Sequence, residues 1–535
     1  MTDSQFEVTC QSHLIFIGNP RHPNCHVVWC LHSDDPNLLW DKTGEGTTRM
    51  HSVFAWSLFF PTFSSPTSFF TIPTRPTMPS KLLEYESLKS VLRNMEPHLR
   101  ILLALRLPAI CFAEKSIPFQ AHTLIFHSYG TQVHDTYYGW GIIRDYHNPN
   151  DTPPKIQKAN EKGGAQVDFD EYGFEVLDSE NSDGPGDVKL GNGNTKHRRD
   201  GSDDMKDRLE HIVEDFEKEL AEAEKRIAQG EKVREFPKYE GPPEEFLENV
   251  VPLFVESPLP LRSLEEIRTD LEEYGASLLP FRYREMNTSP PFTYSLQLKV
   301  DSPPEKVQTY RFPYSIKLNE AIRRLNTLLL GGKAIHVKSL VISKPDMDIR
   351  LPVDLKIRIQ NLIIQRDVSN SLKALEPIID PISYPLESLS VENARLQAAD
   401  YDHPVLQQAN KLYIQSDRFW NDQIPLQLLK NQFVRYSVDQ FSMEERIQLI
   451  RDWFEHGRDI GTRLLLDIRK EKTARALLGR VMEEFEGEKY ERCYVIPMSN
   501  NRELELSYRE ILNPPEGSFA KWIFEMQICQ TVESN

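Results

Sequence analysis

The chain has 535 residues, of which 39% are hydrophobic and 27% charged, and this length is enough for roughly two to four folded domains. Its formal net charge of −17 argues against a protein that binds the phosphate backbone of nucleic acids, because such binding needs a strongly basic face. The six cysteines are too few and too scattered for a disulfide framework, which favours an intracellular location, cytoplasmic or nuclear.

The first 77 residues differ in composition from the rest of the chain. They hold only ten charged side chains, and the stretch 52–74 has none. Prolines at 61, 66 and 73 interrupt that stretch, whereas a membrane-spanning helix needs about 20 mostly apolar residues in a row. We therefore expect residues 1–77 to be a disordered extension that has no membrane role and contributes nothing to folding.

Residues 78–118 are predicted to form a helical head. Apolar side chains recur there at spacings of three and four, which is typical of one or two amphipathic helices split near Pro97. The recurring positions are Leu82, Tyr85, Leu88, Val91, Leu92, Met95, Leu99, Leu102, Leu103 and Leu105. Two apolar runs, "HTLIF" and "TYYGWGIIRDY", predict strands in a small β-containing segment at 119–176.

The middle of the chain is predicted to be a connector followed by a strand pair. Residues 177–204 are rich in Gly, Asn, Asp and Ser, which indicates a flexible linker. A charged helix and a proline-rich connector follow at 205–260. The helix is expected to be single and solvated and to be packed by its one short apolar stripe, with a short coiled coil as the alternative. Residues 261–334 predict two strands and the helix "LNEAIRRLNTLLL", which ends at Gly331–Gly332.

Residues 335–530 contain a repeated pattern. The stretches "VKSLVI", "IQNLII", "LESLSV" and "ANKLYI" all read apolar-x-x-Leu-x-apolar, and their shared leucines are Leu340, Leu362, Leu389 and Leu412. The leucines lie 22, 27 and 23 residues apart, and two weaker members, "FVRYSV" (433–438) and "TRLLLDI" (462–468), continue the series. Helical stretches lie between the repeats. One strand and one helix every 20–29 residues is the pattern of a leucine-rich-repeat-like solenoid.

The expected fold is therefore α/β (α+β), with an irregular leucine-rich-repeat-like β/α solenoid at 335–530, and an ordinary α/β sandwich as the alternative. The shared leucines should point into the core, because side chains alternate along a strand. The residues immediately before them should face outward; these are Ser339, Asn361, Ser388 and Lys411. Asn393 stands where a repeat asparagine would bond to the turn backbone.

None of the motifs that resemble a metal-binding or phosphate-binding pattern is complete enough to predict a site. The cysteines and histidines of "CHVVWCLH" (25–32) lack a second pair at zinc spacing. The loop "DFDEYGFEVLDS" (168–179) has aspartates at calcium-loop positions one and three, but Tyr172 and Ser179 replace two ligands, so a polar turn is favoured. "LLLGGKA" (328–334) lacks the full phosphate-loop pattern. We expect no catalytic, cofactor-binding or metal-binding residues and no cofactor.

Several long stretches carry a family resemblance, and they run from about Tyr85 to Trp522: "YESLKSVLRNMEPHLRILLALRLPAICFAEKSIP", "DTPPKIQKANEKGGAQVDFDEYGFE", "GPGD", "LLGGKAIHVKSL", "LRLPVDLKIRIQNL", "DHPVLQQA" and "ERCYVIPM". With them the chain resembles a large, nematode-expanded family that joins an F-box-like head to an F-box-associated-type domain of unknown function. The resemblance implies that the helical head, at 78–118, binds a Skp1-type adaptor of a cullin ubiquitin ligase. It also implies that the carboxyl-terminal domain captures a protein substrate. On the same basis, the candidate adaptor-binding residues are Leu88, Val91, Leu92 and Met95.

The expected function is that of a non-enzymatic protein-interaction subunit, without nucleic-acid or membrane partners. Two other interpretations stay open at this point. One is a structural scaffold whose head only caps the solenoid, and the other is an enzyme whose active-site residues are dispersed along the sequence. Burial separates the interaction subunit from the scaffold, since an exposed apolar stripe on the head favours binding and a fully buried stripe favours capping.

Overall fold

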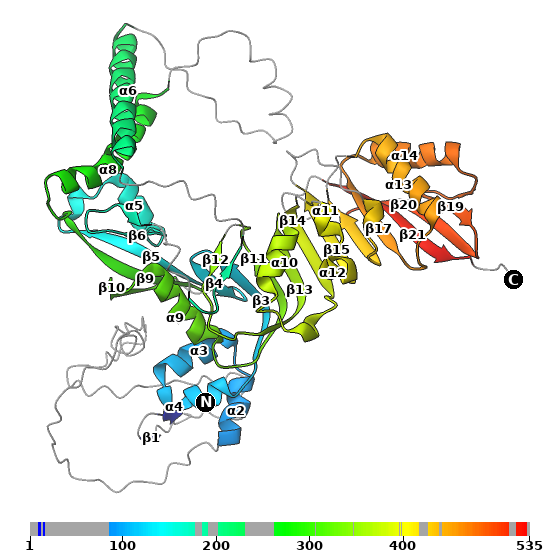
Figure 1. Cartoon of the computed structure of the whole chain (residues 1–535), viewed down its shortest axis with the longest axis horizontal. Helices are drawn as coiled ribbons and strands as arrows, with labels where there is room; N and C mark the ends of the chain where they lie inside the picture. Colours follow the sequence, from blue (N-terminus) through cyan, green and yellow to red (C-terminus); the bar gives the residue numbers. More distant parts are fainter. Residues whose placement is uncertain are drawn as a thin grey trace, which may run out of the picture.

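A computed structural model of the chain describes residues 9–11, 14–16, 85–176, 184–190, 202–229, 262–304, 307–345, 347–394, 396, 398–416, 426–437, 441–512 and 520–531 (Figure 1). Helices and strands are mixed through these residues, so the predicted α/β class is confirmed. Within residues 1–77 the structure describes only a short antiparallel strand pair, β1 (Thr9–Gln11) and β2 (Leu14–Phe16). The other expectations for that segment lie outside the described residues.

Fifteen of the described strands form one sheet, in the spatial order β10-β9-β5-β4-β3-β11-β13-β14-β15-β16-β17-β21-β20-β19-β18. An antiparallel arm opens the sheet and consists of β10 (Gln308–Pro313), β9 (Phe292–Asp301), β5 (Thr136–Tyr146), β4 (Gly130–Val133) and β3 (Phe119–His127). A parallel block follows β3 and consists of β11 (Ile335–Ile342), β13 (Ile357–Gln365), β14 (Ser388–Ala394), β15 (Lys411–Ser416), β16 (Phe433–Tyr436) and β17 (Arg463–Ile468). The sheet ends in antiparallel β21 (Trp522–Gln530), β20 (Arg502–Glu510), β19 (Cys493–Met498) and β18 (Glu488–Lys489).

The parallel block aligns the shared leucines in one row. Leu340 pairs with Leu362, Leu362 with Leu389, and Leu389 with Leu412, and all four side chains are fully buried. The row contains one earlier member, Leu124 of β3, which pairs with Leu340. Its stretch "AHTLIF" has the same apolar-x-x-Leu-x-apolar pattern as the predicted repeats, more than 200 residues upstream of them. The row of leucines therefore begins in β3.

The two weaker members continue the row in a different register from the one expected. Val434 of β16 pairs with Leu412, and Leu464 of β17 pairs with Val434. The predicted stretch "FVRYSV" put Tyr436 at the leucine position, so that alignment is wrong by two residues. Side chains two residues apart lie on the same face of a strand, and for this reason Tyr436 is still buried.

Helices cover one face of the parallel block (Figure 1). They are α10 (Val368–Leu375), α11 (Ala398–Tyr401), α12 (Pro404–Gln408), α13 (Met443–His456) and α14 (Glu471–Glu484), with the 3₁₀ turns η4 (Pro381–Ser383) and η5 (Leu426–Leu428). Helix α9 (Leu318–Leu330) packs against the arm, and its bounds match the predicted helix. Leucines of α9, α10 and α14 share a single core with the leucine row.

An antiparallel helix pair projects from the arm (Figure 1). It consists of α6 (Asp203–Ala228) and α8 (Leu264–Glu285), and a stacked ring pair, Phe216 and Tyr274, joins them at 5.4 Å. Beside the pair lie η1 (Pro149–Asp151) and α5 (Pro154–Glu161). The short apolar stripe of the predicted helix is packed as expected, but it packs against a second helix, so the expectation that the helix is single is wrong. The signal for α8 was present in the sequence, since Ser263 and Glu266 form a capping box at its start.

Part of the predicted flexible linker is fixed in the structure. Strand β8 (Val188–Lys189) pairs with β12 (Asp348–Ile349), and Val188 is buried in the main core. Asp187, in the "GPGD" turn, accepts hydrogen bonds from Arg323 at 2.7 Å and Arg350 at 2.8 Å. Burial alone would raise the pKa of Asp187, but these hydrogen bonds and that from the Gly184 backbone hold the pKa below its usual value. The linker prediction is thus wrong for residues 184–190.

The leucine row yields a paired stability prediction. Leu362→Ala should lower the free energy of unfolding by roughly 2–5 kcal/mol, because it leaves a cavity in a closely packed core. Asn361→Ala should cost about 1 kcal/mol, because its half-buried side chain bonds to Ser339 and Ser388 rather than to solvent alone. Chemical unfolding of both variants tests this, with exposed Lys411→Ala as the neutral control. Equal losses for Leu362→Ala and Asn361→Ala would contradict the register.

Candidate functional site

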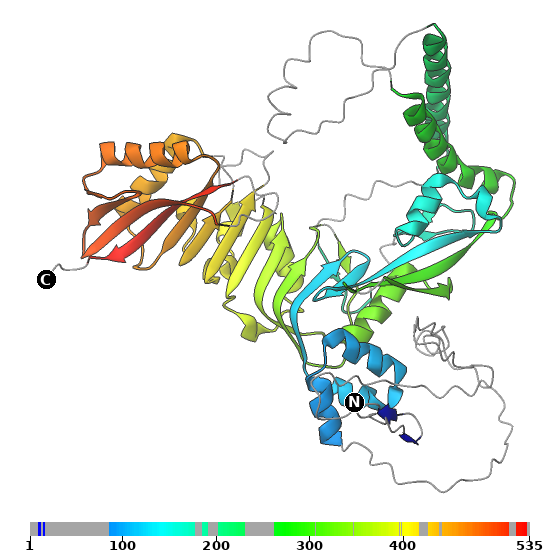
Figure 2. The same cartoon turned by 180° about the vertical axis from the view of Figure 1, so that it is seen from behind.

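The face of the parallel block that lies opposite the helices is the first candidate site (Figure 2). Its central row starts with Ser339, Asn361 and Ser388, which lie on adjacent strands. The Asn361 amide nitrogen donates to the Ser339 hydroxyl at 3.2 Å, and the Ser388 hydroxyl donates to the Asn361 amide oxygen at 2.8 Å. These three side chains satisfy one another, and the row fixes polar groups in place on the open face, as the expected outward orientation requires.

The next row on this face is apolar and aromatic. Val341 pairs with Ile363, and Tyr413 lies one strand beyond Ser390 in the same register. The Tyr413 ring lies 5.6 Å from that of Phe433, in a tilted arrangement. These side chains are half-buried. Aromatic and aliphatic groups of this kind, set among fixed polar groups, are characteristic of surfaces that bind proteins.

Ion pairs lie on the part of this face that the last strands of the chain form. Arg435 donates to both carboxylate oxygens of Asp467, at 3.0 and 3.1 Å. On the adjacent strands, Arg463 donates to Glu525 at 2.7 Å, and Arg509 lies 3.6 Å from the same carboxylate. Asp467 and Glu525 are both buried. The charges at this end are therefore neutralised within the protein and link four adjacent strands, β16, β17, β21 and β20.

The three-helix head is the second candidate site. Its helices are α2 (Tyr85–Arg93), α3 (Pro97–Arg106) and α4 (Pro108–Lys115). They enclose a separate small core of six buried side chains: Leu92, Leu103, Leu107, Ile110, Ala113 and Ile117. The head therefore has a core of its own, distinct from that of the sheet.

The structure separates the four predicted adaptor-binding residues. Leu92 is fully buried inside the head and is unavailable to a partner, while Leu88 and Met95 pack against the same core and are half-buried. Val91 alone is exposed, at 42%. Helical spacing placed all four side chains on one broad stripe, but it did not show which edge of the stripe the other two helices would cover.

Each helix of the head presents at least one exposed apolar side chain. Val91 on α2 is joined by Leu99 on α3, exposed at 47%, and by Phe112 on α4, exposed at 79%. Phe112 was not among the predicted residues. A signal existed in the sequence, because Ile110 and Ala113 form the buried side of α4 and Phe112 lies off it.

A buried ion triad fixes the head to the sheet. The Glu114 carboxylate accepts from Arg100 of α3 at 3.1 Å and from Lys333, just before β11, at 2.6 Å. Both cations also lie over the ring of Phe119, the first residue of β3. Burial lowers the pKa of Lys333 and of Arg100, and the attraction of Glu114 opposes this shift in both.

Two stretches were weighed as metal sites, and the structure describes only one of them. Asp170 accepts the backbone N–H groups of Tyr172, Gly173 and Phe174 at 2.8–2.9 Å, so the described part of "DFDEYGFEVLDS", residues 168–176, contains the polar turn that was favoured. "CHVVWCLH" lies outside the described residues. Among the described residues, no cluster of three His, Cys, Asp or Glu side chains could hold a metal, and no helix is long and apolar enough to cross a membrane.

The triad yields a second stability prediction. Glu114→Gln should lower the free energy of unfolding by roughly 3–5 kcal/mol, because it leaves two buried cations without a counter-charge. Adding Lys333→Met should restore part of the loss, since it removes one of those cations. Thermal or chemical unfolding provides the measurement, with the exposed Glu86→Gln on α2 as control. A Glu114→Gln protein as stable as the control would contradict the buried pairing.

Comparison with known proteins gives one match. The family model "Domain of unknown function (DUF3557)" matches residues 317–470, less than a third of the chain. The matched span starts just before α9 and ends just after β17, so it contains the whole parallel block but not β3. No curated protein matches the chain, and no solved structure matches it.

Proposed function

We propose that this chain is a protein-binding subunit without catalytic activity, in which the head docks a Skp1-type adaptor of a cullin ubiquitin ligase and the open sheet face captures a protein substrate. The observation that carries the proposal is the presence of two surfaces of different character on one rigid body. The head has its own core and shows exposed apolar groups on all three helices, whereas the sheet face shows fixed polar and aromatic rows.

We interpret the parallel block as an irregular leucine-rich-repeat-like solenoid. Support comes from the continuous leucine row and from the way in which consecutive strands pair in chain order from β13 to β17. Buried Asn431 adds further support, since its amide nitrogen donates to the carbonyls of Leu406 at 2.6 Å and Ala409 at 2.9 Å. An asparagine that bonds to the preceding turn is the feature expected of such repeats. The side chain of Asn393, predicted for this role, lies outside the described residues.

A structural scaffold is the second candidate function. The observation that favours it is the ion triad, because Arg100, Glu114 and Lys333 bury the contact between head and sheet. A head that only caps the sheet would need this contact and would need no exposed apolar groups. The two candidates therefore differ in what they expect of Val91, Leu99 and Phe112.

Charge substitutions on the head test the adaptor proposal. Val91→Asp/Phe112→Asp should abolish binding to a purified Skp1-type adaptor, because a charge buried in an apolar interface is strongly unfavourable. The fold should remain, since both side chains are exposed. Isothermal titration calorimetry of the full chain against the adaptor is the measurement. Leu512→Asp, which replaces an exposed leucine far from the head in sequence, is the matched control.

The outcomes separate the two candidates. Binding of the adaptor by the unmodified chain, lost in the double variant and kept in Leu512→Asp, supports the ligase subunit. Absence of binding by the unmodified chain contradicts it and favours the scaffold. Equal binding by all three proteins would show that the adaptor contacts a surface other than the head.

A further inference from the structure

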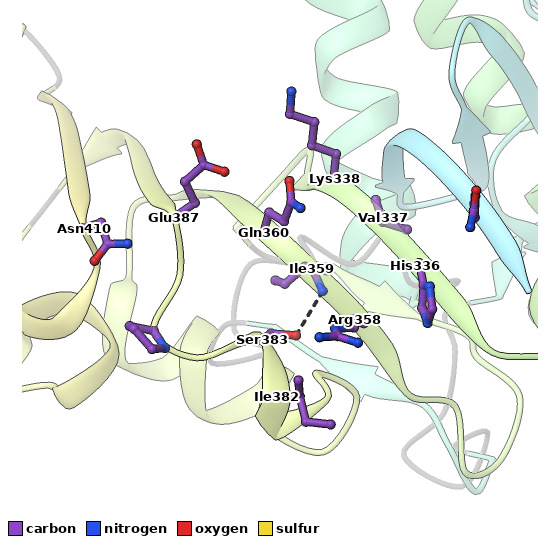
Figure 3. A pocket seen from close by; sticks show the side chains of 12 residues that line it. His336, Val337, Lys338, Arg358, Ile359, Gln360, Ile382, Ser383, Glu387 and Asn410 are labelled. Carbon is purple, nitrogen blue, oxygen red and sulfur yellow. Dashed lines mark hydrogen bonds between the residues drawn. The ribbon is translucent and has the colours of Figure 1, made fainter.

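A depression of about 660 Å³ opens beside the starting ends of β3, β11 and β13 (Figure 3). This volume lies in the range of roughly 300–1,000 Å³ that is common for binding pockets. The turn η4 forms one wall of the depression and is held rigidly, because Ser383 accepts the backbone N–H of Ile359 in β13 at 3.0 Å. The depression is therefore built on strands and an anchored turn.

The lining side chains come from aligned positions of neighbouring strands. His336 of β11 pairs with Gln120 of β3 on one side and with Arg358 of β13 on the other. Two residues further along each strand, Lys338 and Gln360 are also exposed. The parallel register thus brings together two cations, a histidine and two amides that come from three strands far apart in the sequence.

The cations of this depression differ from the arginines on the last strands of the sheet. Arg435, Arg463 and Arg509 lie against carboxylates. None of the ion pairs among the described residues involves Lys338 or Arg358. The single acidic residue of the lining, Glu387, lies 3.8 Å from Lys411 and is itself paired. In a chain of net charge −17, this depression carries exposed positive charge that has no acidic partner among the described residues.

An apolar side chain stands at the rim. Ile382, the middle residue of η4, is 66% exposed, and its backbone N–H is held by Asp380 at 3.0 Å. A ligand that satisfies the cations and also covers Ile382 needs a carboxylate and an apolar group close together. Alternating acidic and apolar side chains on a peptide provide both. Gln120 and Gln360 can bond to its backbone, because amides both donate and accept.

We propose that this depression binds an acidic segment of a partner protein, in which carboxylates pair with Lys338 and Arg358 and an adjacent apolar side chain contacts Ile382. The proposal rests on the proposed protein-binding function and names the class of segment that the sheet face recognises. Charge complementarity identifies the occupant, since an acidic segment is repelled by the chain as a whole and attracted here.

Fluorescence anisotropy with the full chain provides the test. The probe is a fluorescein-labelled peptide of alternating glutamate and leucine, and the matched probe has glutamine in place of glutamate. We expect saturable binding of the acidic probe, at least about tenfold tighter than that of the glutamine probe, and weakening as salt rises from about 50 to about 300 mM. Lys338→Glu/Arg358→Glu should lower the affinity at least about tenfold, and Ile382→Ala by a few-fold.

The control variant is Lys373→Glu/Lys472→Glu, which makes the same change in charge on α10 and α14, in the helix layer. It should keep most of the affinity. Equal losses in the two double variants would overturn the proposal, because they would show a response to net charge alone. Lack of saturable binding, or equal binding of the glutamine probe, would also overturn it. Displacement of the acidic probe by millimolar inorganic phosphate would overturn the choice of a carboxylate ligand and assign the cations to a phosphorylated segment.

This experiment is independent of the adaptor test. A negative peptide result leaves the adaptor titration unchanged, since that titration depends on Val91 and Phe112 of the head. Conversely, failure of adaptor binding leaves the peptide affinity unchanged. Only the loss of both would remove the protein-binding function as a whole.

Discussion

The shared register of the parallel strands is the constraint on which the rest of the structure depends. One row of buried side chains runs from Leu124 through the repeat leucines to Leu464, and it continues into the antiparallel end with Met526 and Leu506. A slip of one residue in any strand would turn its leucine to the open face and its polar neighbour into the core. The row therefore fixes the helices to one side and the Ser339–Asn361–Ser388 contacts to the other.

The same row explains how the head and arm are attached. Because β3 pairs with β11, the chain after β3 must first build the rest of the arm on the other side of β3, together with the α6–α8 pair, and then return through α9 to Ile335. The head immediately precedes β3, and Lys333 immediately precedes β11. The two segments that meet at the Glu114 carboxylate are thus adjacent because Phe119 and Ile335 are paired neighbours.

Much of the parallel block could be predicted from the sequence, because burial on a strand follows a period of two and a repeat makes that period visible. The bounds of α9 were predictable for a similar reason, since its apolar stripe ends at Gly331. The role of Leu124 was hidden by the long insertion that separates it from Leu340. Periodicity also could not show that Leu92 lies under α4 while Val91 stays exposed, because exposure depends on which helices pack together.

The ion triad prevents the head from rotating against the sheet, and this fixes how the two candidate surfaces lie relative to each other. Rotation of the head would have to separate Glu114 from Arg100 or Lys333 and leave a charge buried without a partner, which is strongly unfavourable. A partner on the head and a partner on the sheet face would therefore be held at a fixed separation and orientation. For a ligase subunit such an arrangement presents the substrate in one position relative to the adaptor. A scaffold that merely caps its sheet would gain stability from the same triad, but it would have no use for Lys338 and Arg358, two exposed cations that form no ion pair among the described residues.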